Sequence, residues 1–434
     1  MCVKVRTVPL RTILLNFDID VDFAMVADGR TATHATMTSV TMQPPVNVLD
    51  PSFYVDPLES YRWLRDEAPV YWDPIQKLWA ISRYDDVVTI ERDPVRYSSF
   101  AGSRPHIDLR SDQSMINMDD PAHQAQRSFV ARRFTPRAVR NHEEAVRAVV
   151  AEILDAVAPI GECEAIEAIA SRLPAIMVGD LLGYPRELWP QIRFWSERTM
   201  TLSGQTSPAG PPHTMHPDLV PILEEWVAVT SALIDQRRAE PCDDLISLWS
   251  HTLGWDTKHV LDEIILVLDG GAETTRTVIG TMIRELALQP AERQRLLDDP
   301  TLLSTTAVEE FIRWVSPVLN MRRTATVDHE LHGRRIRAGD ELLLMFASAN
   351  RDPRVFEHPD VLGVARSHTR HVAFGFGTHF CLGAQLARLE IRVMFDELLR
   401  RMPDWELADP DEPRIVPATF ARAYDRIRIR FTPS

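Results

Sequence analysis

Apolar residues recur at three- and four-residue spacing through much of the chain beyond residue 46, and this period predicts amphipathic helices. The clearest predicted helices span residues 58–67, 142–157, 219–238, 257–288 and 382–402. Short alternating or β-rich runs predict strands at residues 70–72, 78–81, 341–346 and 426–431. The hydrophobic pattern therefore predicts a mainly α protein with small β-sheets, an α+β fold.

Two parts of the chain lack this periodicity. Residues 1–45 are irregular and end in Thr-, Met- and Pro-rich sequence, so we expect either a disordered arm or a mis-called start, with Met37 or Met42 as the true first residue. Residues 203–217 are rich in Pro, Ser and Gly and predict a loop between helices. We assign residues 46–434 to a single domain.

Composition narrows the class of protein without naming a function. The chain has 434 residues, 45% of them hydrophobic and 25% charged, as in ordinary globular proteins. Its net charge of -14 argues against nucleic acid or an anionic membrane as a partner. No early apolar run approaches the roughly 20 residues of a spanning helix, and four distant cysteines suggest neither a zinc site nor a disulfide framework. We expect a cytoplasmic protein without a membrane anchor.

The strongest local signal is a cysteine between glycines, in the run FGFGTHFCLG from Phe374 to Gly383, directly before a predicted helix. The glycines allow a tight turn with positive φ, and backbone N–H groups at the helix start can point at the Cys381 sulfur and stabilise a thiolate. A thiolate on haem iron favours O–O cleavage, which indicates oxygen activation. The alternative is that Cys381 is a buried small hydrophobe, the usual role of a free cysteine.

The predicted helix at residues 257–288 is apolar until Gly270 and Gly271, which are followed closely by an acid and by hydroxyl residues. Two glycines inside a helix cost about 1 kcal/mol each relative to alanine, so a local reason is needed. A kink or widened turn would leave room for dioxygen, with a threonine hydroxyl and a carboxylate delivering protons. The alternative is a helix-packing glycine pair beside a solvent-facing glutamate and threonine.

The cysteine run, continued in register from Gly383 to Glu390, resembles the cytochrome P450 family. The resemblance implies the mostly helical cytochrome P450 fold, haem b as the cofactor, and Cys381 as the axial ligand of the haem iron. It also implies that Glu273 and Thr274 are the catalytic acid–alcohol pair, and hence a haem-thiolate monooxygenase.

The same register assigns two further groups of residues. Glu310 and Arg313 are close enough on one helical face to pair and match the structural E-x-x-R pair of the family, and Arg366 falls at its bridging arginine. Residues 362–365 depart from the family pattern beside that arginine. The cations expected to meet the two haem propionates are His123, Arg127, Arg323 and His379. Each of these four, taken singly, resembles a surface charge or a core histidine.

The resemblance also implies where the substrate pocket lies. It would be built from residues 98–116, 177–214 and 318–321 and the turn near Phe420, with Leu266, Asp269, Gly270 and Leu319 as candidate lining residues. A mostly apolar lining suits a hydrophobic small-molecule substrate. We expect hydroxylation of an unactivated C–H bond of a steroid side chain or methyl-branched lipid, with a polyketide- or terpene-type secondary metabolite as the alternative. A carboxylate at Asp269 is costly beside hydrocarbon, so it either faces the protein or binds a polar group of the substrate.

Only 53 residues follow Cys381, too few for a reductase domain, so the resemblance implies NAD(P)H electrons delivered through a separate ferredoxin and ferredoxin reductase. A basic docking face would use Arg132, Arg133, Arg388 and Arg392. We expect a monomer. Two other classes stay open: a haem sensor or carrier without turnover, and a haem-thiolate isomerase or peroxygenase. The Glu273 and Thr274 pair argues against both, because neither activity requires protonation of dioxygen.

Overall fold

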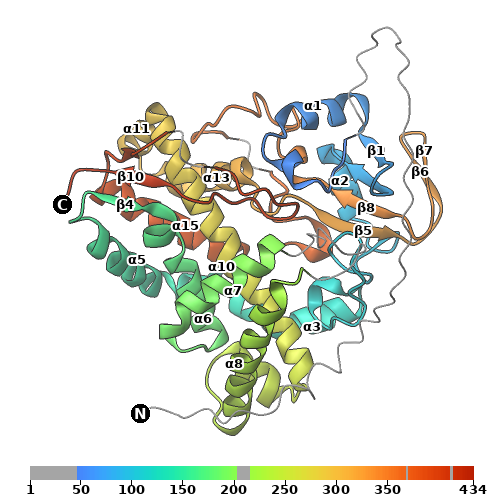
Figure 1. The fold of residues 1–434 in the computed structure, drawn as a ribbon, viewed down its shortest axis with the longest axis horizontal. Coiled ribbons are helices and arrows are strands. Elements are labelled where there is room, and N and C mark those ends of the chain that lie inside the picture. Colours follow the sequence, from blue (N-terminus) through green and yellow to red (C-terminus); the bar gives the residue numbers. More distant parts are fainter. Residues whose placement is uncertain (1–45, 203–215, 368–369, 411–413) are drawn as a thin grey trace. The chain divides into compact units, whose positions relative to one another are not determined.

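The structure, a computed structural model, describes residues 46–202, 216–367, 370–410 and 414–434. The predicted N-terminal arm lies outside these residues, as does most of the predicted loop at 203–217, so both stay predictions. Within the described residues the chain is mainly helical with small sheets, which confirms the predicted fold class (Figure 1).

The five helices predicted from apolar periodicity are all present. α1 (Leu58–Glu67) and α10 (Thr257–Leu288) begin and end at the predicted residues. Three others agree within two residues, namely α5 (Glu143–Val157), α8 (Leu219–Ala239) and α15 (Ala384–Arg401). α10 begins where its N-cap, Asp256, accepts a hydrogen bond from the His259 N–H at 2.8 Å.

The pattern did not single out several helices that complete the fold. The longer ones are α2 (Tyr84–Glu91), α3 (Ala122–Ala131), α6 (Arg172–Leu182), α7 (Trp189–Leu202), α11 (Pro290–Asp298) and α13 (Ala307–Val315). The short ones are α4 (Pro136–Arg140), α9 (Leu245–Ser247), α12 (Leu302–Thr305) and α14 (Phe346–Ala349). α6 is buried on nearly every side, so its sequence shows a continuous apolar run in place of an amphipathic period.

The main sheet has five strands in the order β1-β2-β8-β5-β3. These strands are β1 (Val70–Asp73), β2 (Leu78–Ile81), β8 (Glu341–Leu344), β5 (Met321–Ala325) and β3 (Tyr97–Ser98). β2 and β8 run parallel, and the other neighbours are antiparallel. The predicted strand at 341–346 ends early because Phe346 begins α14.

Two smaller sheets involve strands that are far apart in the sequence or form a hairpin. β10 (Arg428–Arg430) lies between β4 (Glu162–Glu164) and β9 (Glu406–Leu407), which ties the C-terminal segment to the region between α5 and α6. β6 (His329–Leu331) pairs with β7 (Arg334–Ile336). The strand predicted at 426–431 is therefore present, over its central residues.

α10 is the central helix of the helical part and contacts α6, α7, α13 and α15 (Figure 1). Its N-terminal half packs with α6, α7 and α8 in one hydrophobic cluster, and its C-terminal half packs with α5, α13 and α15 in another. The two glycines and the acid–alcohol pair, at 270–274, lie between the two halves. The helix is therefore packed in the hydrophobic core on both sides of this polar segment.

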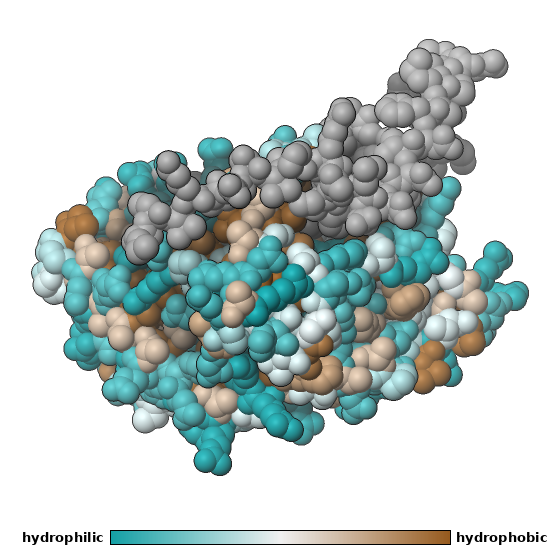
Figure 2. Space-filling view, turned by 90° about the horizontal axis from the view of Figure 1, so that it is seen from below, coloured by the Kyte–Doolittle hydropathy of each residue, from teal (hydrophilic) through white to brown (hydrophobic). Residues whose placement is uncertain are grey.

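Figure 2 shows one face of the molecule, on which hydrophilic residues predominate and hydrophobic residues occur in small groups. Among the helices of the described residues, none is long and apolar enough to cross a membrane.

Candidate active site

The cysteine loop folds tightly before α15. The Cys381 N–H donates to the Phe374 carbonyl oxygen at 2.8 Å, which closes the loop. Gly375 and Gly377 have φ of 67° and 65°, the left-handed conformation predicted for glycines here. A Cβ on Gly377 would lie 2.2 Å from the carbonyl oxygen of Glu91, so this position needs glycine for space as well.

The Cys381 sulfur lies at the N-terminal end of α15. Burial raises the pKa of the Cys381 thiol, whereas hydrogen bonds from the backbone N–H groups of Gly383 and Ala384 and the charges of Arg127 and Arg388 lower it. Donors directed at a sulfur stabilise its anionic form, and a bound metal cation stabilises that form further. The environment of Cys381 therefore fits a thiolate ligand of a metal.

Four cationic or basic side chains gather beside this loop, as the family register predicts. The rings of His123 and His379 lie 4.2 Å apart between centroids, and the buried Nε2 atoms of both have no hydrogen-bond partner in the part of the chain that the structure describes. Arg127 donates to the Phe380 carbonyl oxygen. Burial and then the charges of Arg323, His123 and Arg127 lower the pKa of His379 to about 2. Unpartnered nitrogens among crowded cations are what the two propionates of haem would satisfy, so these residues fit that cofactor.

Glu91, the last residue of α2, supports the cysteine loop and was missed by the sequence reasoning. Its Oε1 lies 2.7 Å from Nη2 of Arg323, and its Oε2 accepts a hydrogen bond from the Phe376 N–H at 3.0 Å. The carboxylate thus holds one of the four cations against the loop. The only sequence signal was an acid at the end of a short apolar segment, which is common in surface helices.

α10 is α-helical throughout, so the widened turn expected at the two glycines is absent. Thr274 Oγ1 instead donates to the Gly270 carbonyl oxygen at 2.8 Å, one turn back on the same helix. The widened turn was therefore wrong, whereas the alternative of a kink at the glycines stays a prediction.

The two glycines have different surroundings. Gly270 is exposed, and a Cβ there would meet no atom within 4 Å. A Cβ on Gly271 would lie 2.8 Å from Cγ2 of Val178 in α6. Gly271 is therefore a helix-packing residue, as in the alternative reading of the pair, while Gly270 leaves α10 open beside Thr274.

Glu273 does not face solvent. It is buried and forms an ion pair with Arg276, whose Nε donates to Oε2 of Glu273 at 2.9 Å. Burial raises the pKa of Glu273, and the charge of Arg276 and its hydrogen bonds oppose this rise. Arg276 was missed by the sequence reasoning, although its three-residue spacing from Glu273 is the same as that of Glu310 and Arg313.

Asp269 contacts the protein through α7. Its Oδ1 accepts a hydrogen bond from Thr199 Oγ1 at 2.6 Å. Burial raises the pKa of Asp269 to about 7, and the Thr199 hydrogen bond and the charge of Arg104 oppose the rise. Of the two alternatives for this carboxylate, contact with the protein is therefore present, through one of its two oxygens.

Residues from all four segments expected to form the pocket come together near Asp269. They are Arg104 from the first segment, Thr199 and Met200 from the second, Val318 and Met321 from the third, and Phe420 from the last. Leu266 is partly buried among the apolar residues around the N-terminal half of α10. Leu319 lies elsewhere, buried with Tyr54 and Leu343 in a cluster beside α1 and the main sheet, because its neighbour Val318 points to Phe420 instead.

The E-x-x-R pair is fully bonded in the structure. Arg313 donates from Nε and Nη2 to the two carboxylate oxygens of Glu310 at 2.7 and 2.8 Å. Arg366 Nε donates to Glu310 Oε2 at 3.0 Å, which gives it the bridging position expected from the register despite the unusual sequence before it. The structure thus brings all three residues together.

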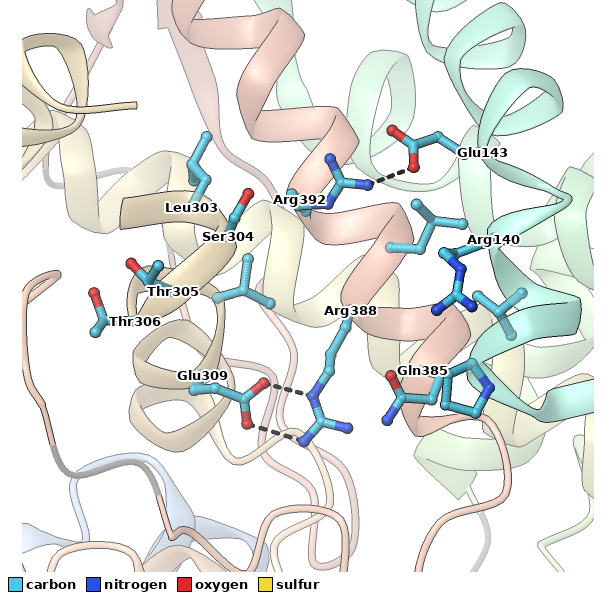
Figure 3. Close-up of a pocket in the computed structure, with 14 residues that line it drawn as sticks. Arg140, Glu143, Leu303, Ser304, Thr305, Thr306, Glu309, Gln385, Arg388 and Arg392 are labelled. Carbon is cyan, nitrogen blue, oxygen red and sulfur yellow. Dashed lines mark hydrogen bonds and ion pairs between the residues drawn. The ribbon is translucent and has the colours of Figure 1, made fainter. Parts of the chain in front are cut away.

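α15 also borders a pocket of about 230 Å³ that lies between α4, α12, α13 and α15 (Figure 3). At its edge Arg388 makes two hydrogen bonds to Glu309, and Arg392 pairs with Glu143 at 2.9 Å (Figure 3). Arg133 pairs with Asp243 at 2.6 Å. Three of the four arginines expected to form a basic docking face therefore already have carboxylate partners.

A mainly helical fold, a partly buried cysteine whose thiolate is favoured by backbone N–H groups, and an adjacent cluster of cations fit the class of haem-thiolate proteins. Comparison with known proteins agrees. The family model "Cytochrome P450" matches residues 301–423. The chain is 38% identical over 405 residues to a steroid C26-monooxygenase of Mycolicibacterium smegmatis, covering 92% of this chain and 99% of that protein.

Two further relatives extend the comparison. A methyl-branched lipid omega-hydroxylase of Mycobacterium tuberculosis is 35% identical over 377 residues, which cover 80% of this chain and 84% of that protein. CYP109E1 from Bacillus megaterium, solved in complex with testosterone, superposes with a TM-score of 0.78 at 29% identity, covering 88% of this chain and 99% of that one. The chain belongs to the cytochrome P450 family and is a cytochrome P450 monooxygenase.

Proposed function

We propose that Cys381 binds the iron of haem b and that His123, Arg127, Arg323 and His379 contact the haem propionates. The proposal is supported by the backbone N–H groups directed at the sulfur and by the two unpartnered histidine Nε2 atoms. Haem bound through a thiolate supplies the electron-rich iron at which monooxygenases of this family activate dioxygen. Glu310, Arg313 and Arg366 hold the fold around the loop and take no part in the chemistry.

We infer that Thr274 and Glu273 deliver protons. Thr274 Oγ1 lies beside the open Gly270 position and carries a proton that now bonds the Gly270 carbonyl oxygen. Rotation about χ1 redirects this proton toward the open side. Glu273 is a suitable proton source because burial raises its pKa, and its exchange of protons requires the ion pair with Arg276 to open.

The substrate we propose is a hydrophobic molecule of the steroid or methyl-branched lipid class, hydroxylated at an unactivated C–H bond of its aliphatic chain. The observation that carries this proposal is the apolar cluster of Met200 and Phe420, which is connected to Asp269 of α10 through Thr199 and Arg104. An aliphatic chain beside these residues is desolvated and lies close to the proton donor. The names of the two enzyme relatives support the same substrate class.

Electrons would come from NAD(P)H through a separate ferredoxin and its reductase. The docking face we propose is the side of α15 that carries Arg388 and Arg392, together with Arg132 and Arg133 from the end of α3. Because carboxylates already pair with three of these arginines, an acidic ferredoxin would bind there by exchanging partners, and the complex should weaken steeply with salt.

The first test is the carbon monoxide difference spectrum of the dithionite-reduced holoprotein, compared with that of Cys381→His. We expect a strongly red-shifted Soret band in the wild type alone. A histidine-like band in the wild type would overturn the assignment of Cys381.

The second test measures coupling and substrate class together. With a ferredoxin system and a steroid or methyl-branched lipid, Thr274→Ala should consume NAD(P)H while forming more peroxide and less hydroxylated product. Thr281→Ala, two turns further along the same helix, is the matched control and should keep wild-type coupling. Equal coupling in both variants would overturn the role of Thr274, and absence of any hydroxylated product from either substrate class would overturn the substrate proposal.

A further inference from the structure

Arg104, in the segment between β3 and α3, has an unusual environment for a guanidinium group. Among the described residues, its buried Nη1 has no hydrogen-bond partner, and its Nη2 donates to the Met200 sulfur at 3.6 Å. Its Cζ lies 3.0 Å from the centroid of the Phe420 ring. Thioether sulfur and an aromatic face are weak partners for a cation, so most of the hydrogen-bonding capacity of Arg104 is unused.

Asp269, whose charge acts on Arg104, does not accept the free hydrogen bonds of this guanidinium. The charges of Arg104 and Asp269 influence each other, but the two side chains form no ion pair within 4 Å, and Asp269 Oδ1 already accepts from Thr199. Arg104 is partly buried as a whole, and burial of its guanidinium lowers its pKa to about 9 although the charge of Asp269 opposes this change. Buried charges in native proteins are normally paired, so an anionic partner from outside the chain would complete the site.

Asp269 favours the same kind of partner. Burial raises its pKa to about 7, so at neutral pH a large fraction of the molecules carry an Asp269 O–H that can donate a hydrogen bond. Arg104 offers donors only. The two side chains lie close enough for their charges to interact. Together they would recognise a group that accepts hydrogen bonds and carries negative charge, whereas an ammonium group would be repelled by Arg104.

We propose that Arg104 and Asp269 form a polar subsite that binds a carboxylate at one end of an otherwise apolar substrate. This proposal rests on the proposed function, which concerns the apolar part of the substrate, and adds that the substrate is an acid. Thr199 positions Asp269 from α7, and Met200 and Phe420 exclude water from around the guanidinium.

The placement along α10 orients the substrate. Asp269 precedes Thr274 by five residues, about 7.5 Å along the helix axis. In this proposal the carboxylate binds at Asp269 and the aliphatic chain extends along α10 past Gly270 toward Thr274. The carboxylate end is kept away from the hydroxyl that delivers protons, and the reacting C–H bond belongs to the apolar part.

The test compares binding of acids and their neutral esters to the haem-loaded protein. Myristic acid is compared with methyl myristate, and a steroid with a side-chain carboxylate is compared with its methyl ester, by spectral-shift titration and by calorimetry. We expect each acid to bind about 10- to 100-fold more tightly than its ester, the range of a charge-assisted hydrogen bond. Equal affinities, or no binding of either acid, would overturn the proposal.

Two variants assign the preference to named residues. Arg104→Met keeps the volume but removes the charge, and it should lose the preference for acids while ester affinity stays the same or rises. Arg104→Lys should keep part of the preference. Arg110→Met, an exposed arginine of the same segment that pairs with Asp108, is the matched control and should behave as wild type. A full acid preference in Arg104→Met would overturn the proposal.

A pH series separates recognition by Asp269 from a merely structural role. Thr199, Arg104 and Glu273 are the groups that act on this carboxyl, and the acids stay ionised throughout. Acid affinity of the wild type should fall as pH rises from 6 to 8, a range in which Arg104 stays charged, because ionised Asp269 repels the ligand, and Asp269→Asn should abolish this dependence. A pH-independent wild type would show that Asp269 takes no part. Hydroxylated products from the neutral esters test the proposed function separately, whichever way the acid preference turns out.

Discussion

The charged side chains around Glu310 and those around Arg104 differ in how completely they are hydrogen-bonded. Around Glu310, both carboxylate oxygens accept from Arg313, and Arg366 and the Gly363 N–H add further donors. Arg313 Nη1 also donates to two backbone carbonyl oxygens, at 2.8 and 3.0 Å. Around Arg104, one guanidinium nitrogen has no hydrogen-bond partner among the described residues, and another donates to a sulfur. The first group is complete within the chain, and the second is not.

The difference indicates what each group is for. A buried polar network is favourable only when its members are satisfied, so the complete group around Glu310 is able to hold the fold. An incomplete group lowers stability and persists where another molecule completes it. The same contrast separates the Glu310 group from His123 and His379, whose unpartnered Nε2 atoms lie beside the cysteine loop.

The largest expected effect comes from breaking the complete group. Arg313→Met should lower the free energy of unfolding by about 3–5 kcal/mol, because it leaves Glu310 buried with only Arg366 as its cation. Urea unfolding measures this loss. Arg335→Met removes an exposed arginine paired with Asp328 and should change stability by less than about 0.5 kcal/mol. Equal unfolding midpoints for the two variants would contradict the structural role of the Glu310 group.

Removing Arg104, the cation of the incomplete group, should change the free energy of unfolding in the opposite direction. Without ligand, Arg104→Met should keep wild-type stability or gain up to about 3 kcal/mol, because a buried charge without an ion-pair partner is replaced by an apolar side chain of similar volume. The thermal unfolding temperature, measured beside that of Arg313→Met, gives the comparison directly. A loss as large as that of Arg313→Met would mean that Arg104 belongs to the structural charges after all.

Glu263 of α10 is intermediate, since only one of its oxygens is bonded. Oε1 accepts from the Met115 N–H at 2.8 Å and from Gln126, while Oε2 is buried without a partner, and Asp112 and Asp262 lie close enough to interact with it. Burial raises the pKa of Glu263 to about 7. A raised carboxyl pKa means that the folded state favours the protonated form, so this group weakens the fold as pH rises from about 4.5 to 7.

Glu263→Gln keeps the accepting oxygen and removes the charge. The variant should be more stable than wild type by roughly 1–3 kcal/mol at pH 8, and the difference should vanish near pH 4.5. Unfolding free energies at both pH values test this prediction. A constant difference across the range would show that the charge of Glu263 is already compensated in the fold.

Much of the fold could be predicted from the sequence, because amphipathic helices carry a clear period. α1 has the predicted ends since it has one apolar face against the core. α10 has them because its first half is amphipathic, although its second half is buried nearly throughout. α6 was not predicted because it is buried on nearly every side, and no period distinguishes a helix of that kind from a buried strand. Periodicity reports one-sided burial, and helices without it are recognised only in three dimensions.

The candidate site likewise contains residues that a local sequence motif predicts and residues that come together only in the folded structure. Cys381 and its glycines were predicted because the loop is local, and the close approach of Gly377 to Glu91 shows why the residue type is restricted there. Arg104 and Thr199 were not identified because no local pattern connects residues that meet Asp269 from distant segments. The signal that could have indicated such partners was Asp269 itself, a carboxylate on an apolar helix that must be hydrogen-bonded or bound to a ligand.

The smallest effect concerns the two glycines of α10, which test whether open space there serves binding or packing. Gly270→Ala should stabilise the protein by up to about 1 kcal/mol, the helix-propensity difference, since its Cβ meets no atom within 4 Å. Gly271→Ala should destabilise it by about 1 kcal/mol, because its Cβ would lie 2.8 Å from Cγ2 of Val178 and the strain outweighs the propensity gain. Thermal unfolding temperatures show whether each variant is more or less stable than wild type. Substrate titration distinguishes binding from packing, because only Gly270→Ala should narrow the range of bulky ligands that bind. If both variants lost stability alike, Gly270 would be a packing residue too, and the open side of α10 would need another explanation.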